Sequence, residues 1–121
     1  MFGELRGGAP PVRLNDTLWL FVHSHLYTTY VITLDALSYA VTGYTLYAFN
    51  LYSGPVTFVC GAVFDVGDHS WLLSAGLDDV KVELARIPHA LVAAAIVPYG
   101  TLAGIPMPEA GGAVPSFSAV Q

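Results

Sequence analysis

The feature that most constrains this chain is a regular alternation of short apolar runs and turn residues over residues 17–87. The runs are rich in β-branched and aromatic residues, and Asn, Asp, Gly and Pro lie between them. A strand about every ten residues is typical of an antiparallel meander. We therefore predict an all-β fold. The expected strands cover 17–25, 28–37, 44–52, 56–65, 70–76 and 80–87, with a tight hairpin at 66–68.

The two ends of the chain have a different composition. Residues 1–14 are rich in Gly and Pro, which argues against a helix there. After Pro88 the chain is rich in Ala, Gly and Pro, and we predict a short helix near 89–97 and then a disordered tail. Residues 87–108 hold no charged side chain, but Pro98, Gly104 and Pro106 interrupt the run, so we do not expect a membrane helix. The predicted domain is 1–88, followed by the tail 89–121.

Composition limits the partners of the chain. Its 121 residues form one domain at most. They are 55% hydrophobic and 11% charged, where soluble domains usually carry about 25% charge, so we expect a partner or a second copy to cover apolar surface. The net charge of −5, with four Lys and Arg, argues against nucleic acid and against an anionic membrane surface.

The single cysteine, Cys60, excludes an internal disulfide and a CxxC zinc pattern. Inside an apolar run, it is predicted to be a small buried hydrophobic residue. The first residues lack a basic segment followed by an apolar one, so no secretory signal is predicted and we expect a cytoplasmic location.

Two segments in a fixed order carry a resemblance to a known family. The first is RGGAPP, followed by an apolar strand that ends in VHSH, and the second is VTFVCGAVFD, followed by a hairpin and a strand that ends in AGLDD. Together they resemble the C-terminal part of the five-bladed β-propellers of glycoside hydrolase family 130, the mannoside phosphorylases, and of related propellers fused to glycosyltransferase domains. The resemblance covers residues 4–88 and implies about two blades, whereas a closed ring takes at least four.

The resemblance also implies roles for individual residues. His23 would face a central sugar or phosphate site, Asp79 would hydrogen-bond a sugar hydroxyl or orient phosphate-binding groups, and Arg6 lies close to a basic, anion-binding position of the family. The catalytic acid of the family comes from an earlier blade. Val22, Val59 and Ala75 replace the family's Tyr, Pro and Tyr, which puts phosphorylase chemistry in doubt.

We therefore expect a partial carbohydrate-active propeller of glycoside hydrolase or phosphorylase type. It would bind sugar and be inactive as an isolated chain. No cofactor is expected, and inorganic phosphate is a candidate co-substrate, with phosphorolysis, hydrolysis and binding alone left open. Upstream blades of a larger chain or further copies of this one would complete the ring. Whether the assembled protein is an enzyme stays open.

Plainer interpretations stand beside these. Asp78 and Asp79 also suit a solvated turn, and they are not a glycosidase acid pair, because neighbouring strand residues point to opposite faces. His23 and His25 share a strand face, which suits metal binding, but no metal is expected. The alternative function is a non-catalytic β-domain used for protein interaction or assembly.

Overall fold

The computed structural model describes residues 5–24, 27–46, 48–49, 57–78 and 81–99. In these residues the regular structure is almost entirely antiparallel strand, arranged in two sheets. The helix found there, α1 (His89–Ala95), has seven residues. The prediction of an all-β fold is therefore confirmed.

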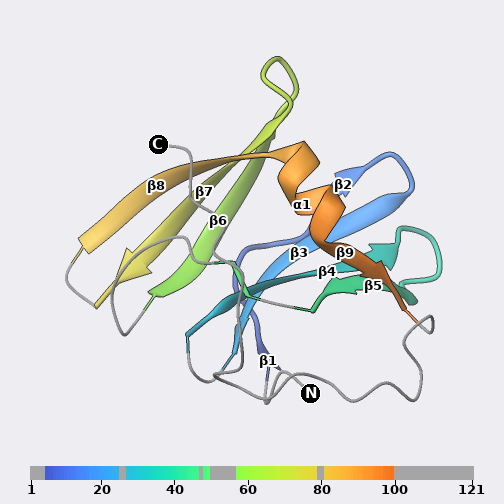
Figure 1. The fold of residues 1–121 in the computed structure, drawn as a ribbon, viewed down its shortest axis with the longest axis horizontal. Coiled ribbons are helices and arrows are strands. Elements are labelled where there is room, and N and C mark those ends of the chain that lie inside the picture. Colours follow the sequence, from blue (N-terminus) through green and yellow to red (C-terminus); the bar gives the residue numbers. More distant parts are fainter. Residues whose placement is uncertain (1–4, 25–26, 47, 50–56, 79–80, 100–121) are drawn as a thin grey trace.

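The first sheet contains six strands. Its central path is β3 (Thr17–Ser24), β4 (Thr29–Asp35), β5 (Val41–Thr45) and β9 (Ile96–Pro98). Two short strands, β1 (Leu5–Arg6) and β2 (Val12–Leu14), both pair with β3: β1 lies beside the end of β3 and β2 beside its start. Within the Gly- and Pro-rich beginning of the chain, residues 5–6 and 12–14 therefore line one edge of this sheet (Figure 1).

The second sheet is a three-stranded meander of β6 (Thr57–Asp65), β7 (Ser70–Leu77) and β8 (Lys81–Pro88). Helix α1 follows β8 directly and leads into β9, which pairs with β5 of the first sheet. Figure 1 shows this helix bridging from one sheet to the other. The end of the described chain is thereby tied back to the first sheet.

The core lies between the two sheets. On β7 the residues Trp71, Leu73 and Ala75 alternate along the strand, so they share one face, and all three are fully buried. They pack with buried residues of the first sheet, such as Phe21 and Val31. Burying an apolar side chain of this size stabilises the fold by about 1.5–3 kcal/mol. The apolar runs that predicted the strands thus supply the residues of this shared core.

Gly8 lies close to the backbone of one strand from each sheet. A Cβ atom at this position would lie 2.8 Å from the carbonyl oxygen of Val59 in β6, and closer still to the carbonyl oxygen of Phe21 in β3. The neighbouring Ala9 N–H donates a hydrogen bond of 3.1 Å to that same Phe21 oxygen. The backbone of the Gly-Gly segment therefore fits between one strand of each sheet because it lacks a side chain here.

The predicted third strand was wrong at its start. The expected strand 44–52 left out Gly43, but Gly43 lies inside β5, which begins at Val41 and already ends at Thr45. A Cβ atom at Gly43 would meet the Ile96 side chain at 2.6 Å, so the glycine makes room for β9. Phe49 forms an isolated bridge with Thr29, and residues 50–52 lie outside the described residues.

Cys60 was predicted to be buried, and this was wrong because it is exposed. The register of β6 against β7 shifts between Val59 and Gly61. Such a bulge inserts an extra residue and changes which residues face inward. Val59 remains in the core with 1% exposure, while the Cys60 Sγ lies 3.5 Å from the Ser74 carbonyl oxygen.

The prediction for the region after β8 is confirmed in part. Helix α1 falls within the predicted 89–97, whereas the strand β9 was not expected. The predicted disordered tail, from residue 100 onward, lies outside the described residues. Among the residues that are described, no helix has the length and apolar character needed to cross a membrane.

Candidate functional site

The predicted residues His23 and Arg6 lie together at one end of the first sheet. His23 is the second-last residue of β3, and Arg6 of β1 is its direct partner across the two strands. The imidazole stacks on the Tyr27 ring, with 5.8 Å between centroids and 7° between planes. On the other sheet, the Phe58 ring lies 6.0 Å away. We call Arg6, His23 and Tyr27 the strand-end group.

Burial and charge both act on His23. Partial burial lowers its pKa below the usual value of 6.5, and the positive charge of Arg6 lowers this pKa further. The imidazole is therefore neutral at pH 7. Its Nδ1 atom is buried, and within the described part of the chain it has no hydrogen-bond partner. Buried polar atoms nearly always have a partner, so such an atom needs an explanation, for example a bound water or ligand.

The third predicted residue, Asp79, lies outside the described residues, as does His25. Asp78 is described: it follows the last residue of β7, is exposed, and has a left-handed backbone with φ of 51°. Because Leu77 pairs with Thr57 at the start of β6, the end of β7 lies beside the strand segment that holds Phe58. The roles implied for Asp79 stay predictions.

A second site lies at the other end of β3, between the sheets. It is a cleft of about 370 Å³. One wall comes from the β2–β3 turn and the start of β3, and the other comes from the β6–β7 hairpin, with the first residue of α1 between them. We call it the aromatic cleft, and its main lining residues are Asn15, Thr17, Trp19, Phe64, His69 and His89.

His89 is held by a ring of aromatic neighbours. Its imidazole lies 5.0 Å from the Trp19 ring, 5.4 Å from Phe64 and 5.1 Å from His69, each in an edge-to-face arrangement. The buried Trp71 donates a hydrogen bond of 3.1 Å from its Nε1–H to His89 Nδ1. A neutral imidazole has one donor and one acceptor nitrogen. Nδ1 is the acceptor here, so the proton lies on Nε2.

The environment also keeps His89 uncharged. Burial lowers its pKa below 6.5, and the neighbouring His69 lowers this pKa further. Protonation would place a second proton on Nδ1, opposite the Trp71 N–H, and would break that hydrogen bond. At pH 7 the cleft therefore presents a neutral imidazole with an N–H donor.

Two turn residues of the cleft have left-handed backbones. Asn15 has a φ of 53° and His69 a φ of 51°. Asn adopts this conformation readily, whereas glycine is the usual residue at such a position in a tight turn. The backbone N–H of His89 donates to the carbonyl oxygen of His69 at 3.1 Å. The hairpin that carries His69 is thereby fixed against the start of α1.

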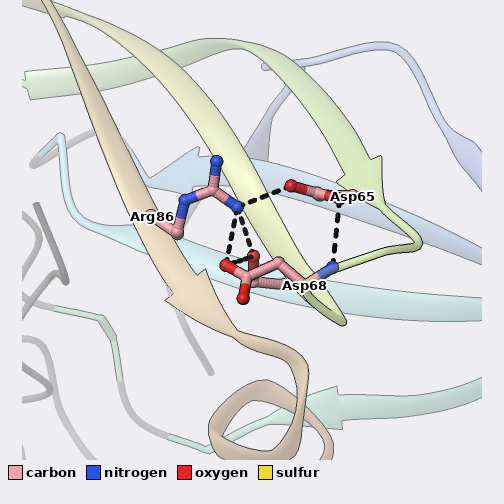
Figure 2. A network of polar contacts seen from close by, with 4 residues as sticks. Asp65, Asp68 and Arg86 are labelled. Atoms are coloured by element: carbon pink, nitrogen blue, oxygen red, sulfur yellow. Dashed lines mark hydrogen bonds and ion pairs between the residues drawn. The ribbon is translucent and has the colours of Figure 1, made fainter.

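A polar network holds the same hairpin from its other side (Figure 2). Arg86 of β8 places its Nη1 atom 2.9 Å from Asp65 Oδ2 and 3.0 Å from Asp68 Oδ2, and it donates a 2.6 Å hydrogen bond to the Ser70 hydroxyl. The hydrogen bond from Arg86 and one from the Asp68 N–H lower the pKa of Asp65. Both carboxylates face the guanidinium, so we interpret this network as structural.

Sequence reasoning did not find the aromatic cleft. Its members come from three separate segments, 14–19, 64–69 and residue 89, and no short motif joins them. The one local signal was a histidine in the hairpin turn, at a position where glycine is usual. Among the described residues, no three His, Cys, Asp or Glu side chains group closely enough to hold a metal ion.

Comparison of the chain with known protein families, with curated proteins and with solved structures finds no match in any of the three.

Proposed function

We propose that this chain is a carbohydrate-binding β-module of propeller type, in which the strand-end group binds a sugar or its phosphate. The observation that carries the proposal is the buried His23 Nδ1 atom, which has no hydrogen-bond partner among the described residues. The resemblance of RGGAPP and AGLDD to the family 130 propellers supplies the ligand class.

The chemistry of the group suits such a ligand. A neutral imidazole can donate to one sugar hydroxyl and accept from another. The Tyr27 ring, stacked on His23, offers an apolar face for a sugar ring. Arg6, exposed and directly opposite His23, brings a guanidinium suited to phosphate oxygens. The proposal is one of binding, with any catalytic acid supplied by another part of the assembled protein.

The test is a calorimetric titration of the chain with mannose, mannobiose and inorganic phosphate. We expect His23→Ala and Asp79→Ala each to weaken sugar binding at least about tenfold. A loss of affinity of this size is expected when one charged or well-placed hydrogen bond is removed. Arg6→Ala should weaken phosphate binding, and Arg13→Ala, which removes an exposed arginine of β2, is the matched control. Equal affinities in wild type and His23→Ala would refute the proposal.

A second candidate function, assembly, is favoured by the outer face of the second sheet. Val82 and Leu84 of β8 are 69% and 61% exposed, and Val63 of β6 is 62% exposed. The register β6-β7-β8 puts these three side chains on the same face. Within the described strands, β8 pairs with β7 alone, which leaves its outer edge open. Open edges and apolar faces of this kind promote association, here with a second copy of the chain.

Light scattering on a dilution series of the purified chain measures this association. A concentration-dependent mass that Leu84→Lys shifts to the monomer supports assembly. A monomer at all concentrations rules out self-association through this face.

A further inference from the structure

We infer that the aromatic cleft is a second binding site, and that it takes a small uncharged heteroaromatic ring whose edge accepts a hydrogen bond from His89. The cleft shares no residue with the strand-end group. The inference therefore goes beyond the proposed carbohydrate site and does not depend on it.

The charge of the lining selects an uncharged ligand. Among the described residues that line the cleft, there is no Asp, Glu, Lys or Arg. Its described lining holds two ionisable groups, His69 and His89, and His89 is neutral at pH 7. A charged ligand would lose its hydration there without gaining an opposite charge, which is strongly unfavourable. The nearby guanidinium of Arg86 is engaged by Asp65 and Asp68.

The walls of the cleft favour a flat ligand. Trp19 belongs to β3 of the first sheet and Phe64 to β6 of the second, and the His89 ring lies within 5.4 Å of both. Aromatic rings from both sheets therefore line the cleft beside His89, and a planar aromatic ring is a ligand shape that can pack against them. A sugar ring buries less apolar surface against such rings than a planar aromatic ring does, because hydroxyls surround it.

The hydrogen-bonding pattern fixes how such a ligand binds. Because His89 Nδ1 accepts from Trp71 Nε1–H at 3.1 Å, His89 offers its Nε2–H as a donor. An aromatic nitrogen or carbonyl on the edge of the ligand is the matching acceptor. The same arrangement disfavours a metal ion, because neither nitrogen of His89 has a lone pair free to coordinate it. Asn15 and Thr17 add polar groups at the rim.

Size and rigidity are consistent with a ligand of one or two fused rings. The volume of about 370 Å³ lies at the small end of the range of about 300–1,000 Å³ found for ligand pockets. The hairpin that carries His69 is fixed by its hydrogen bond to His89 N–H and by the Arg86 network. A wall fixed before binding loses little conformational entropy when the ligand arrives.

The experiment uses adenine as the probe, since it is an uncharged bicyclic heterocycle at pH 7.5. The full chain is titrated by calorimetry and by NMR of the two tryptophan indole N–H signals, Trp19 and Trp71. We expect saturable binding that shifts both signals. Methyl α-mannopyranoside and Zn²⁺ are titrated in parallel, and we expect neither to shift them.

Two substitutions remove lining groups while suiting the backbone. His69→Gly and Asn15→Gly place glycine where φ is already positive, so we expect both variants to fold. Each should weaken adenine binding about 2- to 10-fold, the loss expected for one neutral hydrogen bond or ring contact. Tyr39→Gly is the matched control, because Tyr39 also has a positive φ, of 61°, is exposed, and does not line the cleft.

The position of the donor is tested with His89→Phe, which keeps a ring but removes the N–H. This variant should lose adenine binding altogether. If it does not fold, the two glycine variants still decide the matter. The inference is overturned if adenine leaves the indole signals unchanged, if it binds wild type and both glycine variants equally, or if only the mannoside or Zn²⁺ shifts the signals.

Discussion

The contact at Gly8 makes a quantitative prediction about how the two sheets are held together. Gly8→Ala would place a methyl group 2.8 Å from the Val59 carbonyl oxygen and closer still to that of Phe21. Both obstacles are backbone atoms of paired strands, so neither can rotate away as a side chain would. The chain must instead move Gly8 outward, which also strains the hydrogen bond from Ala9 N–H to the Phe21 oxygen.

The expected destabilisation is about 3 kcal/mol, the upper part of the usual range for overpacking, because two rigid contacts must be relieved. That is a large fraction of a typical stability of about 5–15 kcal/mol. The neighbouring Gly7 is the matched control. A Cβ atom there would meet nothing within 4 Å, and its φ lies outside the left-handed region. Gly7→Ala should therefore be neutral, or stabilising by up to about 1 kcal/mol through the unfolded state.

Urea unfolding followed by tryptophan fluorescence measures both variants, since Trp71 is fully buried in the core between the sheets. We expect a clearly lower midpoint for Gly8→Ala, at an unchanged slope of free energy against urea. Surface substitutions normally change stability by up to about 0.5 kcal/mol. If the free energies of unfolding of the two variants differ by less than this, the close contacts of Gly8 with the Phe21 and Val59 backbones are wrong.

Three further predictions concern charge and association. The pKa of Asp65 is lowered in the fold, so Asp65 stabilises the fold at pH values above its unfolded pKa of 3.8. This contribution is lost as the pH falls through the folded pKa. In an acid unfolding series, Arg86→Met should lower the stability at pH 7 and should also reduce the further loss of stability in acid. The pKa of His89 is also lowered, so the unfolded state binds more protons, and stability should fall as the pH drops from 6.5 toward the folded pKa. Thermal unfolding of the wild type at pH 5 to 8 should show this fall in melting temperature. A smaller fall in His89→Phe would identify His89 as its source. Leu84→Lys should lower the mass-average molecular weight in light scattering without lowering the melting temperature, because Leu84 is 61% exposed; an unchanged weight would exclude this face as the association surface.

The longer strands were predictable because each shows its own pattern. Strands β3, β4, β6, β7 and β8 have seven to nine residues, long enough for a run of β-branched and aromatic residues between turn residues to appear. Strands β1, β2 and β9 have only two or three residues, and they are strands because a partner edge lies beside them. No local sequence signal of this length identifies a strand.

The two errors at Gly43 and Cys60 have a shared physical reason. A glycine between apolar runs predicts a turn as readily as a close contact, and only the position of β9 decides between them. For Cys60, the bulge beside it changes which residues of β6 face the core. Both features depend on contacts between strands that are distant in the sequence, and the local pattern does not contain them.

The two candidate sites also differ in how far the sequence predicted them. His23 and Arg6 were singled out from short ordered motifs, and the structure places them in direct register on neighbouring strands. The aromatic cleft depends on residues between 15 and 89 that meet only when the two sheets pack together. A single sequence gives no measure of that packing.

One strand connects both candidate sites. Trp19, Phe21 and His23 alternate along β3, so they share the face that is turned toward the second sheet. Trp19 contacts Trp71 at 6.0 Å, Phe21 contacts Trp71 at 5.1 Å, and His23 lies 6.0 Å from Phe58. Gly8 meets the backbone of Phe21, midway between the aromatic cleft and the strand-end group. Because close-packed interiors transmit strain, we expect a displacement at Gly8 to reach both sites, even though the sites share no residue.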